Sequence, residues 1–348
     1  MERDYTIALA GNPNCGKSTV FNQLTGTRQH VGNWPGKTVE KKEGTFQNKE
    51  QKIRVVDLPG TYSLTAYSLE EMIARDYIVK EKPDLVVSIV DAANIERNLY
   101  LTMQLIELGV PVLLALNMMD VVDEREIQID MQKIASSLEV PVVQMVARDG
   151  KGVDELRETI LKLARNSAPY QKKVPAQFNT ELEMQIKKLQ GKIAQLPALQ
   201  GAFDSRWLAI KLLEGDKGVL HDFEQNPVYA PLLEEVRVFT SFYAEKAEMD
   251  IDTQIADAYY TAIHEITCSA VKKPSGRKEN FSDKVDRIVT HRIFGIPIFL
   301  ALMWVVFKLT SDVSAPFLDW VDGAIGGPIT NWLVSILSLL GLNGSWFE

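Results

Sequence analysis

The chain has 348 residues, more than one compact domain usually holds, so two or three domains are expected. Hydrophobic residues make up 46% of it and charged residues 24%, which is typical of a folded protein and not of a disordered one. The net charge of −8 provides no basic surface and therefore argues against a nucleic-acid partner. The two cysteines, Cys15 and Cys268, cannot make a disulfide framework and favour a reducing, cytosolic setting.

The first half of the chain alternates between strand and helix patterns. Short apolar, β-branched runs predict strands over residues 5–11, 38–46, 52–58, 84–92, 111–118 and 141–146. Helix-length segments separate most of them, at residues 17–25, 69–80, 94–108, 129–139 and 153–165. This alternation predicts an α/β domain with a mostly parallel sheet covered on both faces. The run over 38–46 alternates in polarity, and with 52–58 it predicts a hairpin at the sheet edge.

The second half predicts a different architecture. Residues 166–174 are polar and loop-like, which indicates a domain boundary. From residue 180 to residue 271, apolar residues recur at helical spacing and no strand pattern is present. We therefore expect an α/β domain over 1–167, a helical domain over 168–271, a charged linker over 272–290 and a membrane portion over 291–348.

The C-terminal portion predicts a membrane-spanning helix. From Ile293 an apolar run of about 17 residues lies near the lower length limit for a span, which we place at about 292–310. Basic residues precede the run and acidic residues follow it, namely Arg277, Lys278, Lys284, Arg287 and Arg292, then Asp312, Asp319 and Asp322. This asymmetry places residues 1–290 in the cytoplasm and makes the lipid bilayer a partner. The alternative is a buried core helix. A later apolar stretch, 332–342, is too short to span alone.

The stretch GNPNCGKST follows the first predicted strand and opens the first predicted helix, which is the context of a P-loop. Its glycines let backbone N–H groups surround a β-phosphate at a helix N-terminus. Lys17 would bridge the β- and γ-phosphates, and Ser18 would ligate Mg²⁺. Cys15 is a small filler within the loop. The predicted phosphate-binding residues are Gly11, Asn12, Pro13, Asn14, Cys15, Gly16, Lys17, Ser18 and Thr19.

A second motif comes from the strand over 52–58, which ends in the residues Asp57, Leu58, Pro59 and Gly60. A carboxylate at a strand tip beside a P-loop can hold Mg²⁺ through water. The flexibility of Gly60 lets its N–H approach the γ-phosphate. At this distance after a P-loop, the motif supports a nucleoside triphosphate site.

A third motif indicates guanine specificity and consists of Asn117, Met118, Met119 and Asp120. The Asp120 carboxylate can accept from the two N–H donors of guanine, whereas adenine would leave it unpaired. The alternative is an ordinary helix N-cap. A last base-contacting loop is expected at Val146, Ala147 and Arg148, where the Ala147 N–H would donate to the guanine oxygen.

The segment VGNWPGKT predicts a mobile, turn-rich loop that supplies the nucleotide contacts Gly36, Lys37 and Thr38. Thr38 can reach Mg²⁺ and the γ-phosphate, so the loop would order with GTP and release after hydrolysis. The predicted Mg²⁺ ligands are Ser18, Thr38 and Asp57. Trp34 lies in the same loop, and its alternative role is to pack on the sheet edge.

Residue 61, after the second motif, is Thr and not the Gln that orients the attacking water in Ras-type enzymes. Hydrolysis should therefore be slow unless another group supplies charge. The side-chain oxygen of Asn14 could help to hold a K⁺ ion, which would offset the charge developing between the phosphates. The expected catalytic residues are Lys17, Asn14, Thr38 and Gly60.

These motifs, together with the stretches DAANIERNLYLTMQLIELGVPV, RWLAIKLLEGD and VDRIVTHRIFGIPIF, resemble the ferrous iron transport protein B (FeoB) family over about residues 5–310. The resemblance implies a Ras-like GTPase domain, a helical domain like a guanine-nucleotide dissociation inhibitor, and the start of an Fe²⁺ permease in the bacterial cytoplasmic membrane. It also implies that backbone carbonyls of Gly32 to Trp34 complete the K⁺ site. Small cytosolic proteins of the iron uptake system are implied partners, and a homo-oligomer is possible.

The resemblance places the transport residues beyond residue 348, so we expect this chain to be an N-terminal portion that does not transport iron alone. Two alternatives stay open: a membrane-tethered regulatory GTPase, and a GTPase of the tRNA-modifying or ribosome-assembly kind. The histidines His30, His221, His264 and His291 are scattered without metal-site spacing, which favours surface or packing roles for them.

Overall fold

The computed structural model describes residues 5–26, 29–48, 51–65, 67–165, 176–199, 203–246, 249–274, 285, 288–291 and 294–339. The chain divides into two compact units, Met1–Ser275 and Gly276–Glu348. The boundary predicted at 166–174, most of the predicted linker and the basic residues expected before the membrane helix lie outside the described residues.

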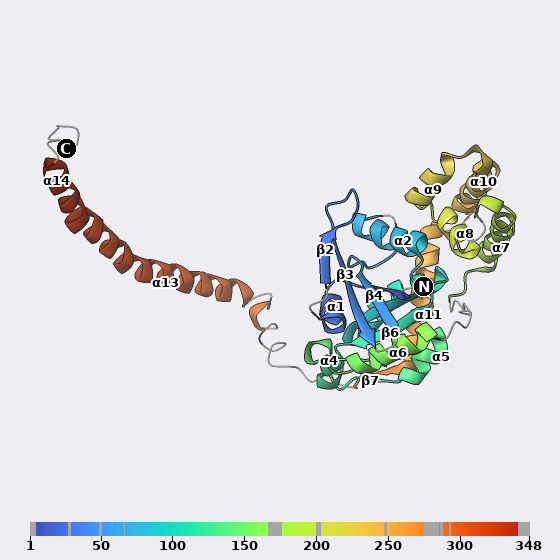
Figure 1. Cartoon of the computed structure of the whole chain (residues 1–348), viewed down its shortest axis with the longest axis horizontal. Coiled ribbons are helices and arrows are strands. Elements are labelled where there is room, and N and C mark those ends of the chain that lie inside the picture. The colour runs from blue at the N-terminus through green and yellow to red at the C-terminus, as the bar shows by residue number, and fades with distance from the viewer. Residues whose placement is uncertain are drawn as a thin grey trace. The chain divides into compact units, whose positions relative to one another are not determined.

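A seven-stranded sheet forms the centre of the first unit (Figure 1). Its strands, in spatial order, are β2 (Gln29–Asn33), β3 (Glu40–Asn48), β4 (Gln51–Asp57), β1 (Tyr5–Gly11), β5 (Leu85–Asp91), β6 (Val112–Asn117) and β8 (Val142–Gln144). The β4–β1–β5–β6–β8 neighbours pair in parallel, whereas β2–β3 and β3–β4 are antiparallel. The mostly parallel sheet and the hairpin toward its edge are confirmed.

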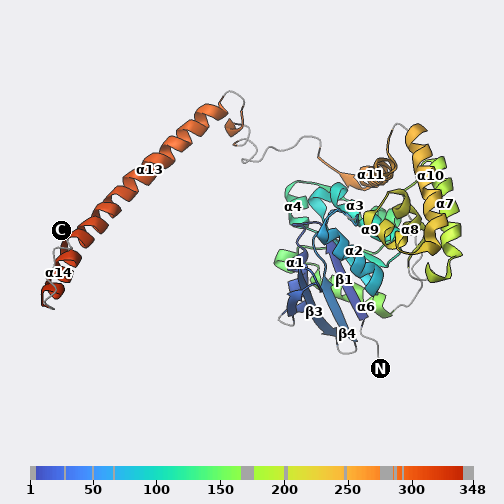
Figure 2. The same ribbon diagram turned by 90° about the horizontal axis from the view of Figure 1, so that it is seen from above.

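Helices cover both faces of this sheet, as the alternation of side chains along a strand requires. One face carries α1 (Lys17–Thr25) and α6 (Val153–Arg165), and the other carries α2 (Leu69–Glu81), α3 (Ile95–Glu107) and α5 (Met131–Leu138). In β1, Ile7 packs with the first group, whereas its neighbour Ala8 packs with the second. Figure 2 shows three of these strands, β3, β4 and β1, from a second direction.

The parallel strands end at one edge of the sheet, and this edge positions the site. β1, β4 and β6 end at Gly11, Asp57 and Asn117, the residues that open the three predicted motifs. Ligands of open α/β sheets bind at the carboxyl ends of the strands. The three motifs are therefore brought to one place by the strand order alone.

β2 and α4 (Met119–Glu124) are elements of the α/β region that the sequence patterns do not predict. Residues 29–33 form β2, although 31–33 were expected to belong to a turn-rich loop; its five residues are all exposed and pair with β3 from Glu40 onward. The second element, α4, is a helix that begins within the NMMD motif. Short 3₁₀ turns, η1 (Ala92–Asn94) and η2 (Ala147–Asp149), follow β5 and β8.

The helical region contains five α-helices and two 3₁₀ turns within the described residues. They are α7 (Thr180–Ala194), η3 (Pro197–Leu199), α8 (Ser205–Leu213), α9 (Lys217–Glu224), η4 (Pro227–Tyr229), α10 (Ala230–Lys246) and α11 (Ile251–Ala270). Figure 1 shows α7 to α10 gathered as one group, while α11 lies along α3 and α5. One hydrophobic cluster runs from the sheet through α3 and α11 into these helices.

The expectation that residues 180–271 hold no strand misses one short pairing. β9 (Val271–Lys272) directly follows α11 and pairs antiparallel with β7 (Gln128–Ile129) of the α/β region. The N–H of Asp130 also donates to the carbonyl of Ala270 at 2.8 Å. The end of the helical region is therefore attached to the α/β region by backbone hydrogen bonds.

The second unit contains a long apolar helical run. α13 (Gly295–Ala324) continues through a π-helical turn, η5 (Ile325–Ile329), into α14 (Thr330–Leu339). Pro328 lies in that turn and lacks the N–H of a regular helix, which accounts for the shifted hydrogen bonding. Within the described residues, Gly295–Leu337 is one run whose length and composition would allow it to cross a membrane. The run extends well beyond the predicted span of about 292–310.

Candidate guanine-nucleotide site

The P-loop lies between the end of β1 and the start of α1, as predicted. Gly16 has φ +88°, and a Cβ atom there would come within 2.3 Å of Asn117 Nδ2. A Cβ at Gly11 would come within 2.6 Å of the Ile89 carbonyl oxygen. Both positions therefore require glycine, one for its conformation and both for close packing.

The side chains of the P-loop separate into buried and exposed sets. Asn12 and Cys15 are buried, whereas Pro13, Asn14, Ser18 and Thr19 are exposed. Asn14 has φ +64°, a left-handed conformation that asparagine tolerates better than most residues. Burial raises the pKa of the Cys15 thiol to about 11, which agrees with its predicted role as a filler.

Lys17 and Asp57 contact each other directly at the centre of the site. Lys17 Nζ lies 2.5 Å from Asp57 Oδ1, and both side chains are at least nine-tenths buried. Burial raises the pKa of the Asp57 carboxyl, and the Lys17 ammonium opposes that shift. The P-loop cation and the predicted Mg²⁺-binding carboxylate thus already face one another.

The residues after β4 are attached to the P-loop strand. The N–H of Leu58 donates to the Leu9 carbonyl at 3.0 Å, and the N–H of Thr61 donates to the Gly11 carbonyl at 3.3 Å. A Cβ at Gly60 would lie 3.4 Å from the backbone of Pro13, so Gly60 sits against the P-loop. Thr61 is only 4% exposed, which fits the absence of a water-orienting side chain at this position.

Asn117 joins the P-loop to the base-binding loop. Its Nδ2 donates to the Cys15 carbonyl at 2.9 Å, and its Oδ1 accepts from the Ala147 N–H at 2.9 Å. The sequence assigned this N–H to a guanine oxygen, but here Asn117 accepts it. The difference arises because the Asn117 amide lies between the two loops. The bond from Ala147 to a base stays a prediction.

Asp120 lies in the first turn of α4 after Met118, which has φ +63°. Its carboxylate accepts from Arg148 Nη2 at 3.2 Å, so the predicted base-reading acid and the last residue of the base loop form an ion pair. The Arg148 side chain is 78% exposed, so this contact is weak and easily opened. Val146 and Met119 lie in the same region. The N–H of Met119 donates to the carbonyl of Met145, the residue before Val146, at 3.3 Å.

The loop around Trp34 contains a buried aromatic side chain, and its predicted mobility stays a prediction. Trp34 is 7% exposed, packs edge-to-face on Tyr77 of α2 at 5.4 Å, and lies under Lys41. The alternative of packing at the sheet edge is therefore confirmed. The Trp34 carbonyl accepts from the Lys37 N–H at 2.9 Å.

The remaining predicted residues of this loop are exposed. Gly36 has φ +68°, and the side chains of Lys37 and Thr38 face solvent. Gly32 lies within β2, opposite Lys41. Within the described part of the chain, no hydrogen bond joins Gly32, Gly36, Lys37 or Thr38 to the P-loop.

Sequence reasoning missed the residues that organise the segment after Gly60. Glu71 accepts hydrogen bonds from Ser63, Thr65 and the N–H of Ser68, and the Ser68 side chain accepts from the Glu71 N–H. The pattern Ser68-x-x-Glu71 is a capping box and could have been found from sequence. Arg75, one turn later, forms an ion pair with Asp216 of the helical region, in which Nη1 donates to both carboxylate oxygens at 2.9 Å.

The four histidines lie in different parts of the described structure. In the described part of the chain no three His, Cys, Asp or Glu side chains converge to hold a metal ion. His30 is exposed in β2, and His221 contacts Gln225 on its own helix. His264 is exposed, which fits the predicted surface role, and it contacts Glu96 and Cys268.

Comparisons with known proteins agree with this geometry. The chain matches the family model described as Ferrous iron transport protein B over residues 5–160, and the model for the FeoB cytosolic helical domain over residues 178–272. It is 36% identical to an Fe(2+) transport protein A/Fe(2+) transporter FeoB fusion protein of Porphyromonas gingivalis, over 98% of this chain and 40% of that protein. It is 40% identical to the Fe(2+) transporter FeoB of Salmonella typhimurium, over 92% of this chain and 40% of that protein.

Solved structures show the same relationship. The cytosolic domain of L. pneumophila FeoB aligns with a TM-score of 0.65 at 36% identity, covering 77% of this chain and 100% of that one. The cytosolic domain of the T. maritima FeoB iron transporter, in a GDP form, aligns with a TM-score of 0.67 at 32% identity, covering 78% and 100%. This chain spans about 40% of the length of the curated relatives that it matches. Its motifs, its fold and these relatives together show that the chain belongs to the ferrous iron transport protein B family.

Proposed function

We propose that this chain binds and hydrolyses GTP as the cytosolic portion of a membrane Fe²⁺ transporter. The observation that carries the proposal is the Asn117 amide, which brings the P-loop and the base-binding loop together beside Asp120. Relatives are described as Fe(2+) transporters, and solved relatives are described with GDP or GMPPNP. Because the chain spans about 40% of those relatives, transport would be a property of the longer protein.

The phosphates would bind along the P-loop N–H groups at the start of α1. Lys17 would leave Asp57 and bridge the β- and γ-phosphates, which places its charge where negative charge develops. Ser18, Asp57 and Thr38 offer the oxygen ligands that Mg²⁺ prefers. When bound, Mg²⁺ would neutralise phosphate charge. Gly60 lies against the backbone of Pro13 in the P-loop, and its N–H would donate to the γ-phosphate.

Guanine would bind between Asn117 and Asp120. The Asp120 carboxylate would exchange its contact with Arg148 for the two N–H donors of the base. This exchange costs little, because water and salt screen an ion pair made by an exposed arginine. A base without those donors would leave the carboxylate without a partner, which supplies the discrimination.

Hydrolysis would be slow and K⁺-stimulated. Thr61 is buried and supplies no water-orienting amide, so another group must stabilise the transition state. Asn14 is exposed on the P-loop and offers an amide oxygen. Carbonyls of Gly32 and Trp34 would complete the cation site, and the Trp34 oxygen, which accepts from the Lys37 N–H, has a second lone pair for the ion.

The nucleotide state would be passed from the 31–38 loop and the segment after Gly60 to the helical region. Arg75 and Asp216 join α2 to α9, and β9 joins α11 to β7. We further propose that the protein acts at the bacterial cytoplasmic membrane, with residues 1–290 in the cytoplasm. Its partners would be small cytosolic proteins of the uptake system and other copies of itself.

Base recognition is tested by Asp120→Asn in the whole chain, purified in detergent micelles. The substitution replaces one carboxylate oxygen, an acceptor, with an NH2 donor. We therefore expect turnover of GTP to fall by about 100-fold and xanthosine triphosphate to become the better substrate. Asp123→Asn, an exposed carboxylate on the same helix, is the control and should leave turnover unchanged. An unchanged GTP preference in Asp120→Asn would refute the proposed function.

The cation role is tested by Asn14→Gly, because glycine removes the amide while tolerating φ +64°. We expect the wild-type GTPase rate to be higher in KCl than in NaCl, and this difference to vanish in the variant. Affinity for GDP should be retained. A variant that still responds to K⁺ would exclude Asn14 as a ligand.

A further inference from the structure

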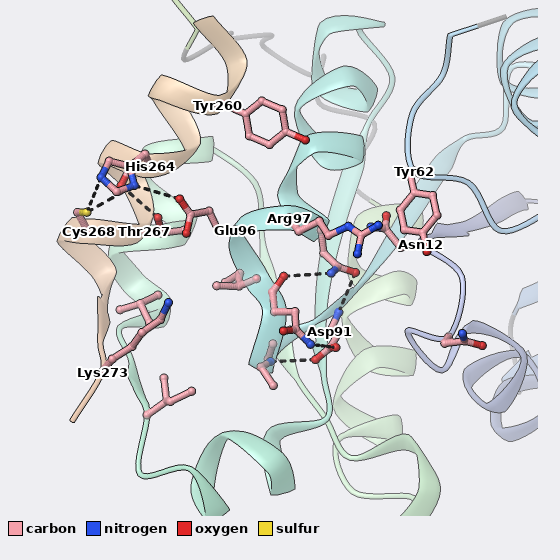
Figure 3. A pocket seen from close by; sticks show the side chains of 18 of the residues that line it. Asn12, Tyr62, Asp91, Glu96, Arg97, Tyr260, His264, Thr267, Cys268 and Lys273 are labelled. Carbon is pink, nitrogen blue, oxygen red and sulfur yellow. Dashed lines mark hydrogen bonds and ion pairs between the residues drawn. The ribbon is translucent and has the colours of Figure 1, made fainter. Parts of the chain in front are cut away.

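A cavity of about 810 Å³ lies beside the P-loop, between the η1–α3 segment and α11 (Figure 3). Its volume is within the range of small-molecule sites, about 300–1,000 Å³. Asn12 and Tyr62 line one end, and His264 and Cys268 line the other. Asn12 is 3% exposed, and its amide nitrogen has no hydrogen-bond partner among the described residues. The cavity therefore contains an unpaired donor that an entering ligand could satisfy.

Three side chains at the α11 end form a connected chain. Glu96 Oε1 lies 3.0 Å from His264 Nδ1, and His264 Nε2 lies 3.3 Å from Cys268 Sγ (Figure 3). An ionised carboxylate can only accept, so Nδ1 carries the proton and Nε2 presents its lone pair to the thiol. His264 and Cys268 are one helical turn apart on α11, while Glu96 reaches them from α3.

This order of groups is the signature of an activated nucleophile, in which a base contacts the nucleophile and a third group orients the base. Cys268 is exposed, so a reagent can reach its sulfur. None of these residues takes part in the proposed handling of GTP. A structural role explains the pairing less well, because an exposed cluster contributes little to stability.

We propose that Cys268 is a nucleophilic thiol that forms a mixed disulfide with low-molecular-weight disulfides entering this cavity. The Cys268 thiol gives its proton to His264 Nε2, and the sulfur attacks one sulfur of R–S–S–R. The bond from Cys268 Sγ to that sulfur forms as the original S–S bond breaks. The leaving thiolate takes the proton from His264 and departs as R–SH. The Cys268 sulfur is oxidised and the leaving sulfur is reduced.

The chain offers a simple assay for this reaction because it has only two cysteines. Cys15 is 1% exposed, and burial raises its pKa to about 11, so it stays protonated and shielded in the folded protein. Thiol chemistry on the native protein therefore reports on Cys268 alone. Unfolding the chain exposes both thiols, so two reactive thiols should be counted in the unfolded chain.

The experiment measures the rate at which oxidised glutathione modifies the whole chain in detergent micelles at pH 7, by intact-mass spectrometry. We expect one adduct per folded chain and none in Cys268→Ser. His264→Gln should slow the reaction about tenfold, because the general base is lost. Glu96→Gln should slow it less, because only the orientation of the ring is affected.

His221→Gln is the matched control, because His221 also contacts a residue four positions along its own helix but faces no thiol. It should react at the wild-type rate. The thermal unfolding midpoint of each variant should stay at the wild-type value, which separates a chemical role from a structural one. A folded chain that forms no adduct, or His264→Gln and Glu96→Gln variants that react as fast as wild type, would overturn the proposal.

Discussion

Asn117 and Cys15 show how single residues hold the P-loop in place. The Asn117 amide satisfies the Cys15 carbonyl on one side and the Ala147 N–H on the other. The Cys15 side chain fills the space beneath the loop, where its sulfur would lie 2.7 Å from a Cβ placed on Gly11. The loop is thus already shaped for phosphate before a nucleotide arrives, which lowers the entropic cost of binding.

Cys15 makes the free energy of unfolding depend on pH in the alkaline range. Burial raises the pKa of its thiol from 9.0 to about 11. The raised pKa belongs to the folded state, so the folded protein holds this proton more tightly than the unfolded chain. The stability that the protonated thiol contributes is therefore complete below pH 9 and is lost as the pH rises to about 11. We expect a loss on the order of 2–3 kcal/mol across this window from Cys15. Thermal unfolding of wild type and Cys15→Ala at pH 8 and pH 10.5 measures it.

Cys15→Ala should unfold earlier than wild type at pH 8, because it leaves a small cavity, but it should lose less stability at pH 10.5. Tyr5 and Tyr77, whose pKa values burial raises to about 12, contribute to the alkaline loss in both proteins at higher pH. Equal pH slopes for the two proteins between pH 8 and pH 10.5 would show that the Cys15 thiol does not titrate differently on unfolding.

At the scale of elements, contiguous motifs were predictable and long-range partners were not. The P-loop, Asp57–Gly60 and Asn117–Asp120 each occupy neighbouring positions, so their spacing to a strand end reveals them. β2 escaped prediction because its residues are all exposed and show no alternation. The Ala147 N–H was assigned to the base because no sequence pattern shows that the Asn117 amide lies next to it.

Arg75 and Asp216 join α2 to α9 although 141 positions separate them. Both side chains are at least nine-tenths buried, and Asp216 also caps α9 by accepting from the N–H groups of Gly218 and Val219 at 3.0 Å. Asp216→Ala should cost about 3 kcal/mol, because it removes the helix cap and leaves the buried Arg75 charge with only the more exposed Asp76 carboxylate as a partner. Thermal unfolding of the whole chain measures this loss.

Asp216→Asn separates the two roles, because an amide oxygen can still cap the helix. Its loss should be smaller than that of Asp216→Ala by about 1 kcal/mol, the usual contribution of a cap. Lys80→Ala is the control on the same helix, since the Lys80–Asp76 pair is exposed and should contribute less than about 1 kcal/mol. Similar thermal unfolding midpoints for Lys80→Ala and Asp216→Ala would mean that the buried pair contributes no more to stability than the exposed pair.

At the scale of the whole molecule, the first unit contains its own core. All residues of the two hydrophobic clusters in the described structure lie before residue 275. The apolar residues of α13, in contrast, are exposed, which is the surface expected of a helix that lies in lipid. We therefore expect a chain ending at Ser275 to fold and to bind GDP with the affinity of the whole chain, as measured by gel filtration and equilibrium binding.

Whether a shortened chain folds should depend on whether it keeps α11. α11 buries Ile255, Tyr259, Ile263 and Ile266 against the rest of the core. Each such side chain contributes about 1.5–3 kcal/mol, so losing all four costs about 6–12 kcal/mol. That is comparable to the whole stability of a domain, about 5–15 kcal/mol. A chain ending at Asp250 should therefore aggregate or fail to bind GDP.

A chain ending at Ala270 is the matched comparison, because it keeps α11 and removes only the pairing of β9 with β7. It should fold and bind GDP with a slightly lower unfolding midpoint. If the chain ending at Asp250 binds GDP as well as this one, α11 is dispensable for the α/β region, and coupling to the membrane portion must run through another contact. If the chain ending at Ala270 also fails, the two-residue pairing is the essential attachment, a result that burial alone would not produce.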